Sequence, residues 1–226
     1  MGGFVERTPR ELYSRWVPFG MLTSHSRAHG QPPKEPWEYD AGFVDEYRRA
    51  VDLKYALMPY VYAQARKASE HGHPMMRSLF FEFPDDPTSW LIEDEYLLGE
   101  DLLVAPLFEP GRRRLVYLPP GSWIDYQNRA SYDGGRWHTI DAGTIPIVLL
   151  VRAGAIIPHA AVAPHTGAIG WKKIELRVYG TAKEPRGSFA LPDGELYRLV
   201  AVPRRGGFAL KDDPLRGRVT WTLRKQ

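Results

Sequence analysis

The spacing of apolar residues divides the chain near Pro84 into two parts of different character. Before Pro84, apolar side chains recur every three or four residues in two segments, which is the spacing of one face of a helix. After Pro84, short apolar runs are separated by glycine, proline, aspartate and asparagine, which is typical of β-strands joined by turns. The pattern therefore predicts an α/β segment followed by β-sheet domains.

The first helix is expected to begin after Thr8. The order Thr8-Pro9-Arg10-Glu11 fits a capping box with proline at the first helical position, in which the Thr8 hydroxyl bonds the Glu11 amide. Apolar residues follow at helical spacing. Pro18 is expected to kink or end the helix, because proline removes a backbone donor and its ring clashes one turn back.

A longer helix is predicted between residues 44 and 65. Its apolar stripe consists of Val44, Tyr47, Val51, Tyr55, Met58, Tyr62 and Ala65. Pro59 predicts a bend within it, and Gly72 and Pro74 predict its end. A stripe this broad needs neighbouring elements, because monomers rarely expose apolar patches above a few hundred Å². Without such neighbours we expect aggregation or pairing with another chain.

The stretch MLTSHSRAHG, residues 21–30, lies between the two predicted helices. As a strand it would place Thr23, His25, Arg27 and His29 on one face. Three cationic or titratable side chains on one face require polar ligands such as hydroxyls or carboxylates. The aromatic loop that follows would leave the carboxyl end of this strand, where α/β barrels build their sites. From these residues alone, a structural and a functional role are equally favoured.

Composition narrows the function classes. The chain has 226 residues, of which 43% are hydrophobic and 25% charged, as in ordinary globular proteins. The formal net charge is only +3, and the one dense basic run, residues 112–114, suits a solvated turn better than a nucleic-acid site. The longest apolar run, IPIVLLV, is too short to span a membrane. We therefore expect neither nucleic acid nor membrane as a partner.

Cysteine is absent from the chain, which excludes disulfides and thiol nucleophiles and favours a reducing compartment. The N-terminus lacks the basic-then-apolar order of a signal peptide, so a cytoplasmic location is expected.

For the other candidate sites, an ordinary structural role is favoured over a functional one. His71 and His73 have no third ligand at metal-site spacing, so a helix-end position is favoured. The acidic clusters 93–95 and 100–101 flank β-type runs, so solvated loops are favoured over the carboxylate pair of a hydrolase. No nucleophile elbow or phosphate-binding loop occurs. We expect no metal and no cofactor.

Several motifs nevertheless occur in the order found in glycoside hydrolase family 31. They are ELYSRWVPFGMLTSHSRAHG, KEPW, LKYALMPYVYAQARKASEHGHPMMRSLFFEFPDD, LLGEDLLVAPLFEPG, YLPPGSWIDY and VRAGAIIP. Over residues 2–160 the chain resembles this family, and FALPDGELYRL resembles the family's last β-domain. The SHSRAHG form is more similar to the bacterial α-xylosidase branch than to the α-glucosidases.

The resemblance implies a fold class of α/β plus all-β, with the last part of a (β/α)₈ barrel followed by two β-sandwich domains. Residues 1–83 are expected to form the barrel part, residues 84–162 the proximal sandwich and residues 163–226 the distal sandwich.

The resemblance also implies retaining hydrolysis of α-xylosides or α-glucosides by two aspartates, which lie upstream of this segment in the family. We expect the chain to be a C-terminal portion that holds no catalytic residue, is inactive alone and has the missing N-terminal barrel portion as a partner. His29 matches a histidine that bonds sugar hydroxyls, Phe4 an aromatic residue beside the same sugar, and Arg27 an arginine that supports the strand. His25 has no role in this comparison.

A second class of function stays open, namely a non-catalytic carbohydrate-binding or assembly subunit. β-Sandwich domains often bind sugars, and the chain offers stacking rings in Trp90, Trp123, Trp137 and Trp171, although core packing is favoured for most of them. Carbohydrate is the expected ligand in either case. The natural substrate and the oligomeric state stay open.

Overall fold

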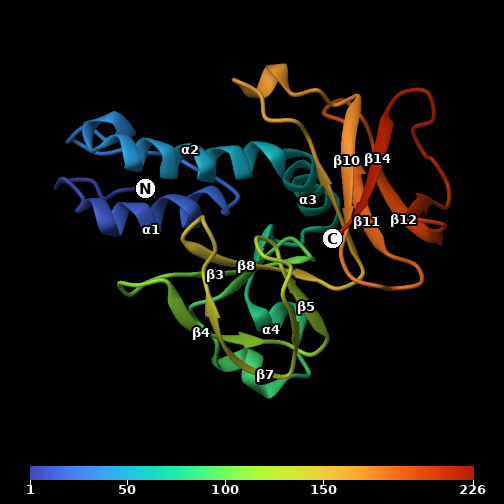
Figure 1. Cartoon of the computed structure of the whole chain (residues 1–226), viewed down its shortest axis with the longest axis horizontal. Coiled ribbons are helices and arrows are strands. Elements are labelled where there is room, and N and C mark those ends of the chain that lie inside the picture. The colour runs from blue at the N-terminus through green and yellow to red at the C-terminus, as the bar shows by residue number, and fades with distance from the viewer.

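The computed structural model describes residues 1–226 as a helical N-terminal part and two β-sheet parts (Figure 1). The helices are α1 (Arg10–Met21), α2 (Ala41–Ala56), α3 (Met58–His71) and the short α4 (Leu79–Glu82), with single 3₁₀ turns at Pro36–Glu38, Pro87–Leu91 and Thr166–Ala168. The change from helices to strands lies close to Pro84, as predicted. None of the helices has the length and apolar character needed to cross a bilayer.

Helix α1 begins without the predicted capping box. The Thr8 hydroxyl donates to the Gly2 carbonyl, and Glu11 pairs with Arg15 one turn later, at 2.8 Å between Oε1 and Nε. That prediction was wrong because both side chains have partners other than the helix amides. Pro18 lies inside the helix, which continues to Met21. Pro18 removes one backbone hydrogen bond of α1, but packing against neighbouring elements keeps the helix intact.

The second predicted helix is two helices, α2 and α3, that meet at Leu57. Pro59 lies in the first turn of α3, so the predicted bend is confirmed. Asp40 caps α2 by accepting from the Phe43 amide at 2.8 Å. Gly72 ends α3 in the left-handed conformation, with φ of 74°, which confirms the predicted end.

The buried face of these helices is offset from the predicted apolar stripe. The buried residues include Phe43, Ala50, Leu53, Leu57, Tyr60, Ala63 and Gln64. These positions also recur every three or four residues, whereas the predicted stripe is half-buried along its length. Tertiary packing therefore selects a neighbouring stripe of the same periodicity.

The strands form two six-stranded sheets and a two-stranded ribbon. They are β1 (Met76–Arg77), β2 (Tyr96–Leu98), β3 (Leu102–Pro106), β4 (Arg113–Leu118), β5 (Ser122–Asp125), β6 (Ser131–Asp133), β7 (Arg136–Asp141), β8 (Ile147–Arg152), β9 (Ala155–His159), β10 (Lys173–Val178), β11 (Arg186–Ala190), β12 (Leu196–Arg204), β13 (Gly207–Leu210) and β14 (Thr220–Lys225). The first sheet has the order β1-β2-β3-β8-β5-β6, the second β13-β12-β11-β9-β10-β14, and β4 pairs with β7.

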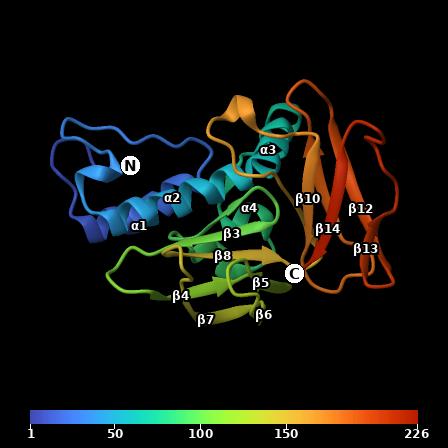
Figure 2. The same cartoon turned by 45° about the horizontal axis from the view of Figure 1, so that its top comes forward.

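The central strands of the first sheet are buried on both faces (Figure 2). Val104 and Leu149 pack with Leu57 on the helix side, whereas Leu103 and Leu150 belong to a second core with the β4–β7 ribbon. Continuous apolar runs such as LLVAP and IVLLV fit strands that are covered on both sides. The helices, the sheet and the ribbon thus form three layers.

The chain passes from the first sheet to the second between Arg152 and Ala155. Strand β9 pairs antiparallel with β10 and parallel with β11, so it belongs to the second sheet. This passage lies ahead of the expected domain boundary at residue 162. Helix α3 packs against β9 and β11, so the helical part contacts both sheets.

Residues 22–29 do not form the predicted strand. They follow α1 as an irregular segment, and the neighbouring Gln31 amide donates to the Phe4 carbonyl at 2.8 Å. A strand needs a row of hydrogen bonds to a neighbouring strand, and no element of this chain supplies one. The strand prediction was therefore wrong for this chain, and the polar side chains of the segment do not share a strand face.

Candidate functional site

Phe4 and His29 lie side by side, although Phe4 precedes α1 in the sequence and His29 follows it. Their ring centroids are 5.5 Å apart and their planes are inclined by 50°. Both rings are open to solvent, with Phe4 55% exposed. An apolar ring next to an imidazole offers one face for packing and two nitrogens for hydrogen bonds. Two of the three predicted site residues are therefore brought together.

This approach of two segments depends on Gly30. A Cβ at this position would lie 2.7 Å from the Gly3 carbonyl oxygen and 3.0 Å from that of Phe4. Any larger residue would push the two segments apart, so the absent side chain lets Phe4 reach His29.

A buried lysine holds the same two segments together. The Lys34 ammonium group donates to the Glu6 carbonyl at 2.8 Å, and the Tyr13 hydroxyl donates to the Lys34 carbonyl at 3.0 Å. Tyr13 is fully buried in α1. Lys34 is thus bonded both to the segment that precedes α1 and to α1 itself.

Lys54 of α2 supports the irregular segment that leads to His29. Its ammonium group donates to the Thr23 carbonyl and to the Ser26 hydroxyl, each at 2.8 Å. The Thr23 and Ser26 hydroxyls in turn donate to the Gly20 carbonyl at the end of α1, each at 2.7 Å. Burial lowers the pKa of Lys54 to about 8. These bonds replace the sheet partner that the segment lacks.

Arg27 and His25 are exposed on the same segment. The Arg27 guanidinium forms no hydrogen bond or ion pair with another side chain, and its expected supporting role stays a prediction. His25 contacts the adjacent Ser24 hydroxyl at 3.0 Å. Sequence reasoning missed Lys34 and Lys54, because their bonds reach backbone atoms distant in sequence and no local motif marks them.

The predicted solvation of the first acidic cluster was wrong for Glu95. Its side chain lies beneath β4, where Oε1 accepts from the Tyr117 amide at 2.9 Å and lies 3.5 Å from Arg114 Nη2. Oε2 has no partner. Burial raises the pKa of Glu95 to about 8. Strand β2 begins at the next residue and turns this carboxyl group into the core.

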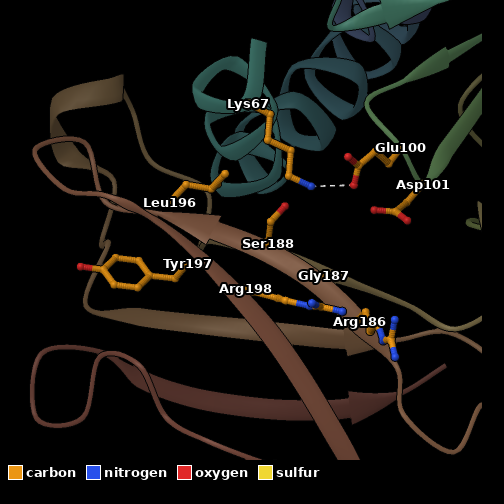
Figure 3. A pocket seen from close by; sticks show the side chains of 9 residues that line it. All are labelled: Lys67, Glu100, Asp101, Arg186, Gly187, Ser188, Leu196, Tyr197 and Arg198. Carbon is orange, nitrogen blue, oxygen red and sulfur yellow. Dashed lines mark hydrogen bonds and ion pairs between the residues drawn. The ribbon is translucent and has the colours of Figure 1, made fainter. Parts of the chain in front are cut away.

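The second acidic cluster borders a cavity of about 370 Å³ between α3, the β2–β3 turn and strands β11 and β12 (Figure 3). Lys67 of α3 donates to Glu100 at 2.6 Å across its upper edge. Burial raises the pKa of the neighbouring Asp101 to about 6. This turn is part of a junction between elements: the Glu100 side chain is 40% exposed, as expected for a solvated turn, whereas Asp101 is half-buried and departs from that prediction.

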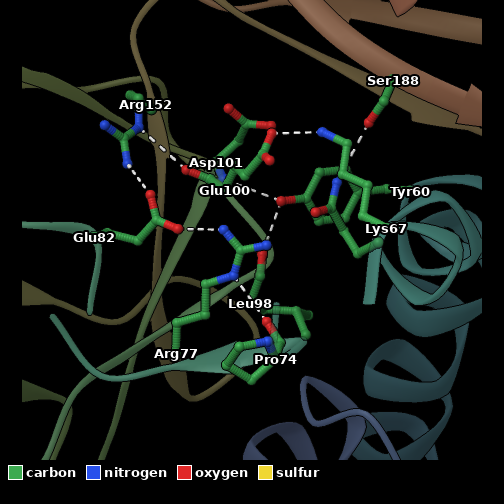
Figure 4. Close-up of polar contacts among 11 residues, drawn as sticks. Tyr60, Lys67, Pro74, Arg77, Glu82, Leu98, Glu100, Asp101, Arg152 and Ser188 are labelled. Atoms are coloured by element: carbon green, nitrogen blue, oxygen red, sulfur yellow. Dashed lines mark hydrogen bonds and ion pairs between the residues drawn. The ribbon is translucent and has the colours of Figure 1, made fainter. Parts of the chain in front are cut away.

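A network of polar contacts holds the β2–β3 turn against α3 (Figure 4). The Tyr60 hydroxyl donates to the Leu98 carbonyl at 2.8 Å and accepts from the Asp101 amide at 3.1 Å. Glu82 pairs with Arg77 and lies 3.9 Å from Arg152. These contacts make the cluster a structural link between α3 and the first sheet.

The tryptophans divide into buried and exposed ones. Trp123 is completely buried, as expected for core packing, and Trp171 is half-buried. Trp90 is 57% exposed and Trp137 48% exposed, so these two depart from that expectation. Trp90 stacks on Phe80 with centroids 4.8 Å apart. His71 lies at the end of α3 as expected, and no three acidic or histidine side chains come together as a metal-binding group.

Comparison with known proteins agrees with this architecture. Residues 1–64 match the TIM-barrel domain of the glycosyl hydrolases family 31, and residues 72–157 match the C-terminal domain of that family. The α-xylosidase of Emericella nidulans is 37% identical over 174 residues, which cover 70% of this chain and 21% of the relative. α-Glucosidase 2 of Bacillus thermoamyloliquefaciens is 35% identical over 161 residues, which cover 70% of this chain and 20% of the relative.

A solved structure of a relative shows the same arrangement of helices and sheets. The crystal structure of the family 31 α-xylosidase from Xanthomonas citri superposes with a TM-score of 0.82 at 29% identity, over 96% of this chain and 26% of that enzyme. The chain thus spans about a fifth to a quarter of the length of these relatives. The expected fold class, the last part of a barrel followed by β-sandwich domains, is confirmed. The chain belongs to glycosyl hydrolase family 31.

Proposed function

We propose that this chain forms one wall of the sugar pocket in a retaining α-glycosidase that hydrolyses α-xylosides or α-glucosides. The observation that carries the proposal is the exposed pair of Phe4 and His29, 5.5 Å apart, in a chain whose relatives include an α-xylosidase and an α-glucosidase. The SHSRAHG segment favours the xyloside.

The chemistry of the pair suits sugar binding better than bond cleavage. An imidazole both donates and accepts, so His29 can bond the hydroxyl groups of a sugar, and the Phe4 ring can cover an apolar face of the same residue. Retaining hydrolysis needs two carboxyl groups about 5–5.5 Å apart. We assign both aspartates to the part of the relatives that this chain does not span.

A chimeric enzyme tests the proposal. The corresponding quarter of the Xanthomonas citri α-xylosidase is replaced by this chain, and kcat/KM is measured with aryl α-xyloside and aryl α-glucoside. We expect hydrolysis by the chimera, with xyloside preferred, and no hydrolysis by the isolated chain.

Two results would contradict the proposal. One is turnover by the isolated chain that persists after removal of host glycosidases. The other is a chimera that melts cooperatively and binds sugar yet hydrolyses neither substrate, which would favour a carbohydrate-binding subunit.

A further inference from the structure

Helix α1 carries two apolar stripes, and only one of them is covered by a neighbouring helix. The covered stripe is buried in a core shared with α2 and consists of Tyr13, Val17 and Met21. Leu12, Trp16 and Phe19 form the second stripe, in which Leu12 is 36% exposed and the other two are half-buried. A helix that is apolar on two sides is typical of one packed between two neighbours.

The second stripe lines an apolar cavity of about 240 Å³, whose other wall is the chain at the end of β3. Phe108 in this wall is 53% exposed, and its ring centroid lies 6.1 Å from that of Phe19. The volume is below the roughly 300–1,000 Å³ of small-molecule sites. The cavity is therefore better suited to the side chains of a packing partner.

The one charged group in this cavity is already paired. Arg15 donates from Nε and Nη2 to Glu11 at 2.8 and 3.0 Å, and from Nη1 to the Leu107 and Phe108 carbonyls at 2.9 and 2.6 Å. A guanidinium group has five donors in all, so little hydrogen-bonding capacity is left for a ligand. An apolar occupant thus leaves no charge of the cavity unpaired.

The apolar surface continues beyond Phe108 onto the first sheet part. A second groove, of about 490 Å³, extends from Phe19 and Phe108 to Phe80 and Trp90. The Phe80 and Trp90 rings are stacked with centroids 4.8 Å apart and are 39% and 57% exposed. The indole N–H of Trp90 donates to the Pro84 carbonyl at 2.9 Å, which fixes the orientation of the ring.

Acidic residues border this second groove. Asp94 is paired with Arg114 at 2.5 Å, Glu95 is buried, and Glu93 is exposed. A partner therefore needs an apolar centre, with polar or basic groups only at this border. The two grooves together form one surface, the α1–Trp90 face, made by Leu12, Trp16, Phe19, Phe108, Phe80 and Trp90. Contiguous exposed apolar surface is typical of an interaction site.

We propose that the part of the barrel that precedes this segment in the relatives docks on the α1–Trp90 face, with one barrel helix packed between the Leu12 stripe and Phe108. Each helix in the outer ring of a (β/α)₈ barrel has two neighbours. Residues 1–64, which match the barrel domain, supply a neighbour of α1 on the α2 side only. Phe108 and Trp90 then bind the β-sandwich part directly to the preceding barrel part.

The absence of cysteine from the chain makes thiol labelling a direct test. Phe108→Cys and Trp90→Cys are introduced one at a time into the isolated chain and into the Xanthomonas citri chimera. Reaction with N-ethylmaleimide is followed by mass spectrometry of the peptide that holds the new thiol. We expect labelling at least about tenfold slower in the chimera, because a docked partner makes the reaction wait for local opening.

Val162→Cys is the matched control, since Val162 is 53% exposed like Phe108 and lies outside the face. It should react at the same rate in the chain and in the chimera. Slow labelling of the isolated chain at both face positions would mean that a second copy of the chain covers the face. Equal rates in chain and chimera would mean that the face stays open. Either result, or a parent chimera that does not fold, would overturn the proposal.

This proposal shares with the proposed function the assembly of the chain with the preceding barrel part, but its measurement requires no hydrolysis. An inactive chimera with protected thiols would contradict the proposed function alone. An active chimera whose face thiols react as fast as in the isolated chain would contradict the docking face alone.

Discussion

Glu95 has a completely buried side chain, whose Oε1 accepts from the Tyr117 amide at 2.9 Å and lies 3.5 Å from Arg114 Nη2, while Oε2 has no partner. Its pKa rises from 4.5 to about 8 because burial disfavours the charged form. Between these pH values the folded chain binds more protons than the unfolded chain. Its stability therefore falls as pH rises from 4.5 to 8.

Glu95→Gln should abolish this pH dependence, since the amide is neutral and still accepts from Tyr117. We expect the variant to gain up to about 1.4 kcal/mol of unfolding free energy over wild type per pH unit across this window. Urea unfolding of both proteins at pH 5, 6.5 and 8 measures the difference in their unfolding free energies. The titration of all other groups is common to both proteins and cancels in this difference. A constant difference across the three pH values would show that Glu95 is ionised in the folded chain.

Lys54 supports the segment before His29 through two bonds of its ammonium group. Lys54→Met keeps the length of the side chain but removes both bonds. We expect the Gln31 amide, which donates to Phe4, to exchange its hydrogen at least about tenfold faster, while amides within α2 keep their rates. Hydrogen exchange followed by NMR provides the measurement. Lys211→Met is the control, because that lysine is exposed and pairs with Glu184 far from the segment; equal rates in both variants would refute the supporting role.

At the scale of elements, the period of the apolar pattern predicted the two long helical segments and the bend near Pro59, but not which face is buried. Val44 and Leu57 show why. Both lie in the same amphipathic region, yet only Leu57 contacts the first sheet, in a core with Val104 and Leu149. A 3.6-residue period defines neighbouring stripes almost equally well, and the partner that selects one of them is distant in sequence.

The difference between the buried face and the predicted stripe can be measured as a difference in the free energy of unfolding. Leu57→Ala should lower the free energy of unfolding by about 2–5 kcal/mol, as expected for a fully buried leucine. Val44→Ala removes a half-buried side chain of the predicted stripe and should cost less than about 1 kcal/mol. Denaturant unfolding compares the two variants. Equal losses would mean that the predicted stripe, rather than the observed face, carries the packing.

The strand predicted for residues 22–29 was wrong for a different reason than the buried helix face. Alternation along a strand says which side chains share a face, but pairing needs a neighbour, and this chain holds the segment through Lys54 instead. The pairing of Phe4 with His29 could be anticipated only from family resemblance, since Gly30 alone gives no sign of which segment approaches it. Glu95 and Asp101 were misjudged because acidic residues next to turns are usually solvated.

At the scale of the whole molecule, α3 joins the helical part to both sheets. It contributes Tyr60 to the core of the first sheet and packs against β9 and β11 of the second. The cavity and the polar network both lie at this junction.

The central claim is that His29 contacts the sugar in the assembled enzyme, and kcat/KM of His29→Ala in the Xanthomonas citri chimera tests it most directly. Loss of a hydrogen bond that tightens in the transition state should lower kcat/KM about tenfold to a few hundredfold, with an unchanged melting temperature. Arg27 is exposed in this chain, and its expected supporting role requires contacts with the rest of the barrel; on that hypothesis Arg27→Ala in the chimera should lose stability together with activity. His25→Ala, at a position without an assigned role, should behave like the parent chimera. Full activity of the His29→Ala chimera, or a loss that follows its unfolding, would contradict the account.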